Sequence, residues 1–198
     1  VLITHNDIND RVRYLNIKGT LEELLNNGVI PIINENDVVS TEEIKFGDND
    51  NLASMIANLV DADLLIILTD QKGMYDKNPD SYKDAKLINS IGIEDLKDFD
   101  SDFSTQSEIG TGGFITKIQA AKRAALSNTY TVIANGLEKN ILSNIFTNSN
   151  AGTLFIPSEK KISAKKQWLD TTDSKGSIII DDGACKAISD NNSLLLVG

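Results

Sequence analysis

The stretch Leu64-Leu65-Ile66-Ile67-Leu68-Thr69-Asp70-Gln71-Lys72-Gly73 decides the fold class of this 198-residue chain. Its first five residues are all apolar, which is typical of a strand buried on both faces of a parallel sheet. The polar residues that follow predict a turn at the carboxyl end of that strand. Ligands of open α/β sheets bind beyond such strand ends, so the stretch predicts both an α/β fold and the place where its site lies.

The same pattern of a buried strand followed by polar residues occurs upstream. The apolar run Val29-Ile30-Pro31-Ile32-Ile33 is expected to form a buried strand, and it ends in Asn34-Glu35-Asn36-Asp37. Further strands are expected over residues 1–4, 131–134 and 153–156, and helices over 6–27, 51–60, 114–127 and 139–146, with Gly28 ending the first helix. Strands that alternate with helices in this way indicate an α/β domain with a mainly parallel sheet.

The composition of the chain changes after residue 157. Residues 1–157 are expected to form the α/β domain, and the polar segment 158–175 is expected to be a linker, whose lysines we interpret as solvated rather than as RNA contacts. Residues 176–198 predict the start of a small β-rich unit, with strands over 177–180 and 194–197. Because the chain opens on a strand-like run without a methionine, we expect a piece of a longer protein, cut off on its N-terminal side.

Charge and cysteine content argue against several classes of function. The 19 Lys and Arg residues are outnumbered by 29 Asp and Glu residues, which gives a net charge of -10. RNA binding is therefore not expected, because it draws on basic surfaces. The chain has one cysteine, Cys185, and one histidine, His5, which excludes an internal disulfide and a cysteine-rich zinc site. We interpret both residues as structural or incidental. This usage is expected of a cytoplasmic protein. No stretch reaches the about 18 apolar residues of a membrane helix, so no membrane partner is expected.

The glycine-rich segment Gly110-Thr111-Gly112-Gly113-Phe114-Ile115-Thr116-Lys117 is a candidate phosphate site. Glycines let backbone amides approach a ligand, a helix N-terminus adds partial positive charge, and Lys117 lies one turn into the predicted helix. The segment is not a Walker loop, since Ile118 follows the lysine, and Ile115 takes the place of the last glycine of G-x-G-x-x-G. The alternative interpretation is an ordinary turn before a helix.

Acidic side chains gather in the two polar clusters upstream of residue 51. Such a group would suit an ammonium group or magnesium, since carboxylates accept hydrogen bonds from amines and are hard metal ligands. Its members are Glu35, Asp37, Asp48 and Asp50, interleaved with Asn34, Asn36 and Asn49. A calcium loop counted from Asp48 is excluded, because its sixth and twelfth positions are Ala53 and Leu59. The alternative is that Asp48 or Asp50 caps the helix that follows.

Taken in order, these motifs resemble those of the glutamate 5-kinases of the amino-acid kinase family. The matching segments are residues 33–37 (INEND), 46–52 (FGDNDNL), 68–75 (LTDQKGMY), 110–113 (GTGG) with Thr116-Lys117, and 152–155 (GTLF). Residues 176–198 resemble the beginning of a PUA domain. The resemblance implies an amino-acid kinase-like three-layer αβα sandwich around a mainly parallel sheet. It also implies that the family's first strand, phosphate loop and second catalytic lysine lie upstream of Val1, so we expect the chain to be inactive on its own.

The resemblance implies roles for individual residues. Asp37 and Asn49 would bind glutamate, with Asp37 pairing with its ammonium group, and Asp50 would orient the catalytic lysines. Thr69 and Asp70 would contact the nucleotide. Lys117 would stabilise charge on the transferred γ-phosphoryl group, and the phosphates of ATP would be lined by Thr111, Gly112, Gly113, Phe114, Ile115, Thr116 and Lys117.

By the same resemblance, the activity is ATP-dependent phosphorylation of the side-chain carboxylate of L-glutamate to L-glutamyl 5-phosphate, the first step of proline biosynthesis. ATP and Mg2+ are implied, with no protein ligand of the metal identified, and so are a homo-oligomer and proline as feedback inhibitor. The carboxylate is already a nucleophile at neutral pH, so alignment and positive charge would carry the catalysis. The alternatives are a kinase of another small acid, such as aspartate, acetylglutamate or carbamate, and a non-catalytic amino-acid-sensing or RNA-binding module.

Overall fold

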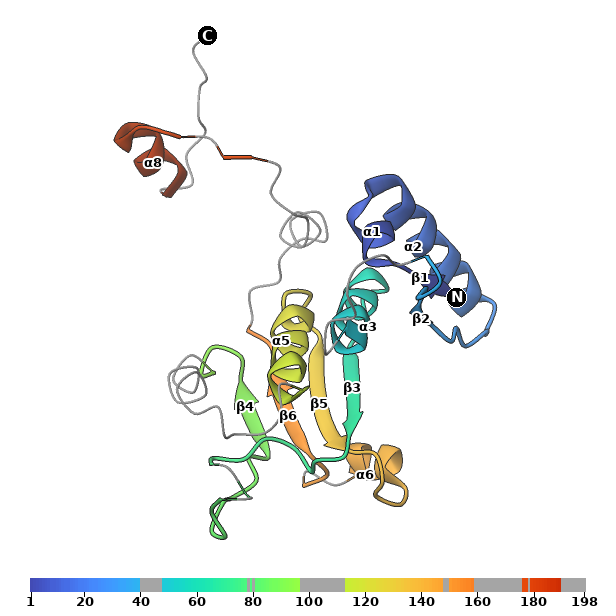
Figure 1. Cartoon of the computed structure of the whole chain (residues 1–198), viewed down its shortest axis with the longest axis vertical. Helices are drawn as coiled ribbons and strands as arrows, with labels where there is room; N and C mark the ends of the chain where they lie inside the picture. Colours follow the sequence, from blue (N-terminus) through green and yellow to red (C-terminus); the bar gives the residue numbers. More distant parts are fainter. Residues whose placement is uncertain are drawn as a thin grey trace.

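The computed structural model describes residues 1–39, 48–77, 79, 81–96, 113–147, 150–158, 176–177 and 179–189 (Figure 1). Along the chain, the elements are β1 (Leu2–Ile3), α1 (His5–Asn9), α2 (Arg11–Asn26), β2 (Asn34–Glu35), α3 (Asp48–Leu59), β3 (Leu64–Thr69), β4 (Ser90–Gly92), α5 (Gly113–Ala125), β5 (Tyr130–Asn135), α6 (Ile141–Thr147), β6 (Thr153–Ile156) and α8 (Asp182–Ser189). Strands alternate with helices over most of this order, which confirms the predicted α/β class.

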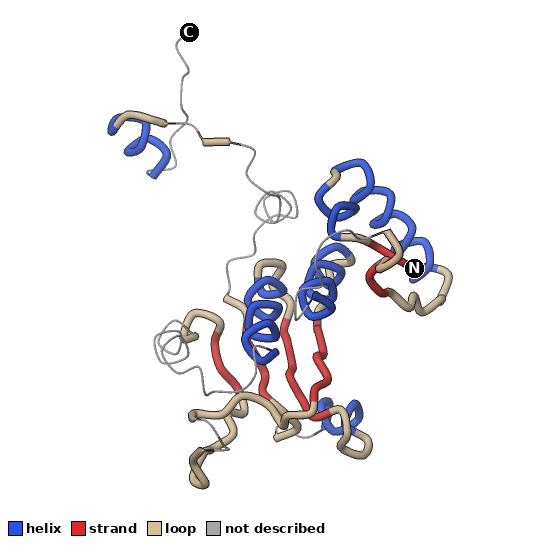
Figure 2. Tube along the Cα trace, in the orientation of Figure 1, coloured by secondary structure: helices blue, strands red, loops and turns tan. Residues whose placement is uncertain are grey.

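The main sheet has the strand order β3-β5-β6-β4, and Figure 2 shows these strands side by side. β3 and β5 are parallel, in a register that runs from Leu64 opposite Tyr130 to Thr69 opposite Asn135. β6 is antiparallel to β5 and parallel to β4. One end of this sheet therefore combines the last residues of β3 and β5 with the first residue of β6, Thr153. We call it the carboxyl end of the sheet.

Helices cover both faces of the main sheet. On one face, Ile118 of α5 packs in a single buried cluster with Ile133 of β5 and Phe155 of β6. On the other face, Val132 of β5 packs with Ile141 of α6. Neighbouring residues of a strand point to opposite faces, which is why Val132 and Ile133 belong to different clusters. The arrangement is the expected three-layer αβα sandwich.

The N-terminal elements pack against α3, which lies beside α5 (Figure 1). Ile3 of β1, Tyr14 and Leu21 of α2, and Leu52 and Leu59 of α3 share one buried cluster. β1 and β2 form a second, two-stranded parallel sheet, and β2 also contacts α3. This cluster ties the segment that precedes residue 40 to the helix that leads into the main sheet.

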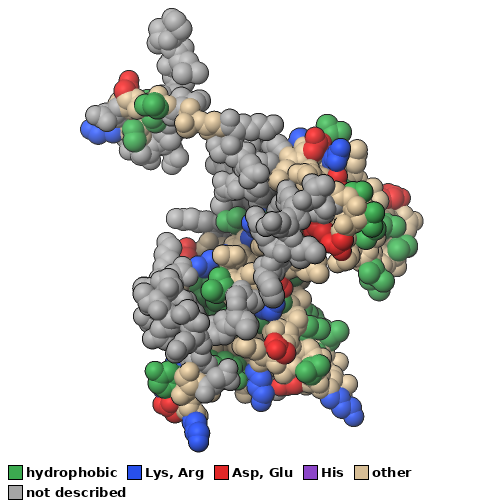
Figure 3. All heavy atoms as spheres, in the orientation of Figure 1, with side chains coloured by type: hydrophobic (Ala, Val, Ile, Leu, Met, Phe, Trp, Pro, Cys, Tyr) green, Lys and Arg blue, Asp and Glu red, His purple; other side chains and the backbone are tan. Residues whose placement is uncertain are grey.

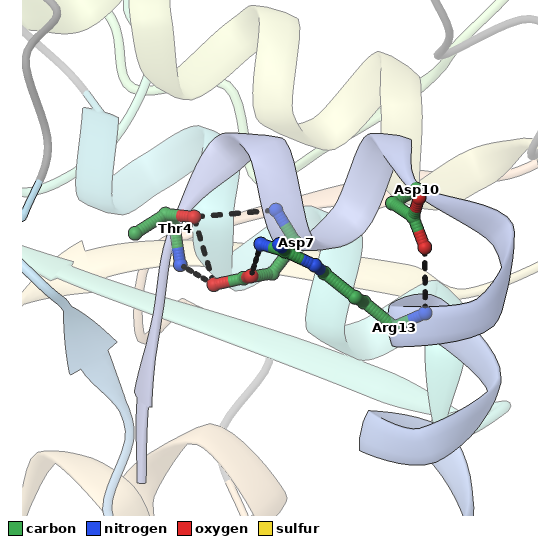
Figure 4. Close-up of polar contacts among 4 residues, drawn as sticks. All are labelled: Thr4, Asp7, Asp10 and Arg13. Atoms are coloured by element: carbon green, nitrogen blue, oxygen red, sulfur yellow. Dashed lines mark hydrogen bonds and ion pairs between the residues drawn. The ribbon is translucent and has the colours of Figure 1, made fainter.

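The single helix predicted over residues 6–27 is divided in two at Asp10, and this expectation was wrong. Thr4 and Asp7 form a capping box in which Asp7 Oδ2 accepts bonds from the Thr4 amide and hydroxyl, at 2.8 and 2.7 Å (Figure 4). Asp10 has an extended backbone, and its Oδ1 accepts the Arg13 amide at 2.9 Å as the N-cap of α2. A second capping carboxylate therefore starts a new helix. At the far end, Gly28 follows the C-cap with φ 71°, as predicted.

The apolar run 29–33 is not the buried strand that its composition predicts. Ile30 and Ile32 are both 86% exposed, and the strand β2 begins only at Asn34. Pro31 lacks an amide hydrogen, and within the described residues no strand extends along this run. Hydrophobic side chains are consequently visible in Figure 3 on the right of the molecule, where the N-terminal elements lie.

Other differences concern short segments and the C-terminal part. The strand β4 has three residues, too few to give a periodic signal, and it was not predicted. The described residues 177, 179 and 180 are not in a strand, and α8 follows them, so the strand expected over 177–180 was wrong in those residues. Residues 159–175 of the linker expected over 158–175, and the strand expected over 194–197, lie outside the described residues. Among the described helices, none is long and apolar enough to cross a membrane.

Candidate functional site

The amino ends of two helices point toward the carboxyl end of the main sheet. α3 leads through a short turn into β3, and α5 leads through a short turn into β5. Each helix lies against the strand that it precedes, so each runs opposite to that strand. Their first turns therefore lie toward the end at which β3 and β5 finish. A helix N-terminus carries about half a positive charge and unpaired amides, so this arrangement favours an anionic ligand.

One carboxylate oxygen joins the first turns of these two helices. Asp50 Oδ2 accepts the Thr116 hydroxyl at 2.8 Å and the Lys117 ammonium at 2.9 Å. The side chains of Asp50 and Lys117 are 15% and 17% exposed, so the ion pair is screened less than one on the surface. Asp50 is the third residue of α3, and its carboxylate bonds across to α5. Within the described residues, the hydrogen bonds of the Asp50 carboxylate are therefore with α5 and not those of a cap of its own helix.

The predicted nucleotide contacts Thr69 and Asp70 lie where β3 ends. The Thr69 hydroxyl donates to Asp70 Oδ1 at 3.0 Å. The backbone carbonyls of both residues accept hydrogen bonds from the end of β5 and the residue after it. Gly136 N donates to the Thr69 carbonyl at 2.8 Å, and Asn135 Nδ2 donates to the Asp70 carbonyl at 3.1 Å. Asn135 was not singled out from the sequence. The available signal was a polar residue directly after the predicted strand 131–134.

Asp37 and Asn49, the predicted glutamate contacts, lie on the same side of the fold as α3. Asp37 is exposed in the turn after β2, and β2 contacts α3. Asn49 is exposed in the first turn of α3. Within the part of the chain that the structure describes, no hydrogen bond joins either side chain to Asp50. Glu35 is half-buried in β2, and the side chain of Asp48 lies outside the described residues.

The glycine-rich segment is described only from its last glycine onward. Thr111 and Gly112 lie outside the described residues, and Gly113 is the first residue of α5. Phe114 packs against the buried cluster under α5, so its side chain serves the core. Ile115 is 44% exposed. Of the predicted phosphate contacts, Thr116 and Lys117 are therefore the polar side chains that the structure places next to Asp50.

A metal site is not formed by side chains alone in the described part of the chain. Among the residues that the structure describes, no three His, Cys, Asp or Glu side chains lie close enough together to hold an ion. Asp50 Oδ2 is already occupied by Thr116 and Lys117. Cys185 is exposed on α8.

The sandwich, the two helix N-termini and the half-buried lysine define an α/β protein in which one end of the sheet favours an anionic ligand. The chain belongs to the amino acid kinase family, whose sequence pattern matches residues 1–135. The expected family and fold are thereby confirmed.

Two relatives show how much of a longer protein this chain matches. It is 47% identical over 201 residues to the glutamate 5-kinase of Hydrogenovibrio crunogenus, and the match covers 100% of this chain and 53% of that protein. It is also 47% identical over 200 residues to the glutamate 5-kinase of a Marinomonas species, covering 100% of this chain and 54% of that protein. The chain thus spans about half the length of these relatives.

The fold is also similar to that of a solved structure. Carbamate kinase from Giardia lamblia bound to AMP-PNP superimposes with a TM-score of 0.52 at 22% identity, covering 71% of this chain and 49% of that one. At this level of identity, the similarity shows a shared fold.

Proposed function

We propose that this chain forms part of an ATP-dependent glutamate 5-kinase, which converts L-glutamate to L-glutamyl 5-phosphate, the first step of proline biosynthesis. The observation that carries the proposal is the 2.9 Å ion pair between Lys117 and Asp50, which joins the first turns of α3 and α5. The choice of glutamate as the acid is supported by the relatives named above, which are 47% identical to this chain.

In the proposed reaction, an oxygen of the glutamate side-chain carboxylate attacks the γ-phosphorus of ATP. The new oxygen–phosphorus bond forms as the bond to the β,γ-bridging oxygen breaks, and ADP leaves. The carboxylate is ionised at neutral pH, so no general base is required. The barrier comes from the approach of two anions and is lowered by alignment and positive charge. Lys117 supplies that charge, and Asp50 holds its ammonium group in place.

The remaining residues are assigned to binding. Asp37 pairs with the ammonium group of glutamate, and Asn49 bonds to the same substrate. Thr69 and Asp70 contact the nucleotide, and residues 111–117 line its phosphates. Mg2+ would supply further positive charge to the reaction, and we assign no protein ligand to it. The exposure of Asp37 and Asn49 supports their access to a ligand.

The organisation of the longer protein is also a proposal. Residues 1–157 belong to its kinase domain, 158–175 form a linker, and 176–198 begin a PUA domain. The enzyme is a cytoplasmic homo-oligomer that proline inhibits by feedback. Its acidic charge of -10 disfavours a role in RNA binding.

The role of Lys117 is tested in a chimera in which this chain replaces the matching segment of the Hydrogenovibrio crunogenus relative. Lys117→Met removes the charge at nearly constant volume. We expect turnover to fall by about 10²–10³-fold, the usual effect of removing one group that stabilises transition-state charge. Lys122→Met, in the last turn of the same helix, is the matched control and should keep its turnover. Equal turnover of the two variants would contradict the role assigned to Lys117.

A further inference from the structure

The first residue of β6, Thr153, is fully buried at the carboxyl end of the main sheet. Its hydroxyl group accepts a hydrogen bond from the Met74 amide at 2.8 Å, and its O–H donates one to the Ile88 carbonyl at 2.6 Å. The Met74 carbonyl, at 3.5 Å, is a longer contact. A hydroxyl has one proton to donate, so the shorter bond to Ile88 takes it. The side chain therefore links two backbone positions outside its own strand.

These two positions form the base of the connection between β3 and β4. Ile88 N donates to the Met74 carbonyl at 2.8 Å, and the next residues, Tyr75 and Leu87, form an antiparallel bridge. β3 and β4 lie at opposite edges of the sheet, so this connection passes the ends of β5 and β6 (Figure 1). Thr153 lies at the start of β6, where it can hold the base of the connection against the sheet.

The segment from Thr69 to Met74 is consequently fixed at both ends. Asn135 and Gly136 hold the Thr69 and Asp70 carbonyls, as described above, and Thr153 holds Met74. Between them, Gly73 has φ 149°, and a Cβ atom there would lie 2.6 Å from Thr153 Oγ1. Glycine is therefore required for the segment to approach this hydroxyl so closely.

We propose that Thr153 is a positioning residue of the nucleotide site, an inference that rests on the function proposed above. Its hydroxyl sets the path of residues 70–74 and thereby the position at which Asp70 meets the nucleotide. Valine has the shape of threonine but would leave the Met74 amide and the Ile88 carbonyl without this partner. Serine would keep both bonds.

The test measures the affinity of the chimera for AMP-PNP by calorimetry, together with the KM for glutamate. For Thr153→Val, we expect about tenfold weaker AMP-PNP binding. This is the effect expected if residues 70–74 take the binding-competent conformation in about one tenth of the molecules. The KM for glutamate should stay unchanged, and Thr153→Ser should restore the affinity. Gly73→Ala, which keeps the hydroxyl but forces the segment away from it, should weaken AMP-PNP binding as well.

The matched control is Thr129→Val at the opposite end of the sheet. Thr129 is 1% exposed, and its hydroxyl donates to the Ala62 carbonyl at 2.7 Å. This variant loses a comparable bond and should keep its affinity for AMP-PNP. Wild-type affinity in Thr153→Val or in Gly73→Ala, or equal losses in the Thr129 and Thr153 variants, would overturn the inference. Failure of the unmodified chimera to bind AMP-PNP would instead overturn the proposed function.

Discussion

Three buried threonines near β5 and β6 show how one residue type meets different needs. Thr129, Thr131 and Thr153 are all at most 1% exposed. The hydroxyls of Thr129 and Thr153 bond to backbone groups. Within the residues that the structure describes, the Thr131 hydroxyl has no partner. A buried hydroxyl without a hydrogen bond costs about 1–3 kcal/mol. The Thr131 hydroxyl is therefore expected to lower the free energy of unfolding.

Replacing Thr131 by valine should stabilise the protein. The change removes the unbonded hydroxyl, adds a methyl group of similar size and keeps the β-branched shape that suits a strand. We expect the free energy of unfolding, measured by urea denaturation, to rise by about 1 kcal/mol. Thr129→Val is the control and should lower it, because that hydroxyl is bonded. A loss of stability in Thr131→Val would show that its hydroxyl does have a partner.

The sequence predicted part of the site and could not predict the rest. Asp50 and Lys117 were singled out, and the structure places them 2.9 Å apart. Thr153 lies in the segment GTLF, which was noted without a role. Its contact with Met74 depends on β6 lying next to β5, and Asn135 reaches Asp70 because β5 lies next to β3. Strand order is a property of the whole sheet, so local patterns do not reveal such contacts.

At the level of single elements, the capping box that begins α1 gives a pH-dependent contribution to stability. Burial alone would raise the pKa of the Asp7 carboxyl, but hydrogen bonds from Thr4 and Arg13 outweigh it and hold the pKa below its usual value. A carboxyl whose pKa is lower in the folded state stabilises that state at neutral pH. This contribution is lost as the pH falls from about 4, the unfolded value, through the folded value.

Asp7→Asn should therefore be destabilising at pH 7 and neutral in strong acid. We expect a loss of about 1 kcal/mol at pH 7 in the free energy of unfolding, since a charged acceptor and an exposed ion pair are removed. The difference from wild type should shrink below about pH 4. Asp10→Asn is the matched control, because asparagine caps helices as well as aspartate does. A difference for Asp7→Asn that persisted unchanged in acid would refute the assigned cause.

Two apolar runs of similar composition became different elements. Residues 64–68 lie within β3, which is paired along six residues with β5. Residues 29–33 precede β2, whose pairing with β1 covers two residues, and Ile30 and Ile32 are exposed. Composition indicates what a run can become, but its burial requires a neighbouring strand. The helices α3, α5 and α6 carried their own signals and were predicted within a few residues.

For the whole molecule, the sequence predicted the layers of the sandwich better than the direction of every strand. The alternation of strands and helices was sufficient for the α/β class and the αβα layering. β6 was predicted as a strand, yet its antiparallel pairing with β5 was not. The direction of β6 places Thr153 next to the ends of β3 and β5, so it contributes directly to the proposed site.

The measurement that tests the central claim is acyl-phosphate formation by the chimera, with ADP release followed in parallel and hydroxylamine as the trap. Glutamate, aspartate, acetylglutamate and carbamate are supplied separately with ATP and Mg2+. We predict hydroxamate and ADP formation with glutamate, and a higher KM for glutamate but not for ATP in Asp37→Asn. A folded chimera that releases ADP with another of these acids and not with glutamate would contradict the claim.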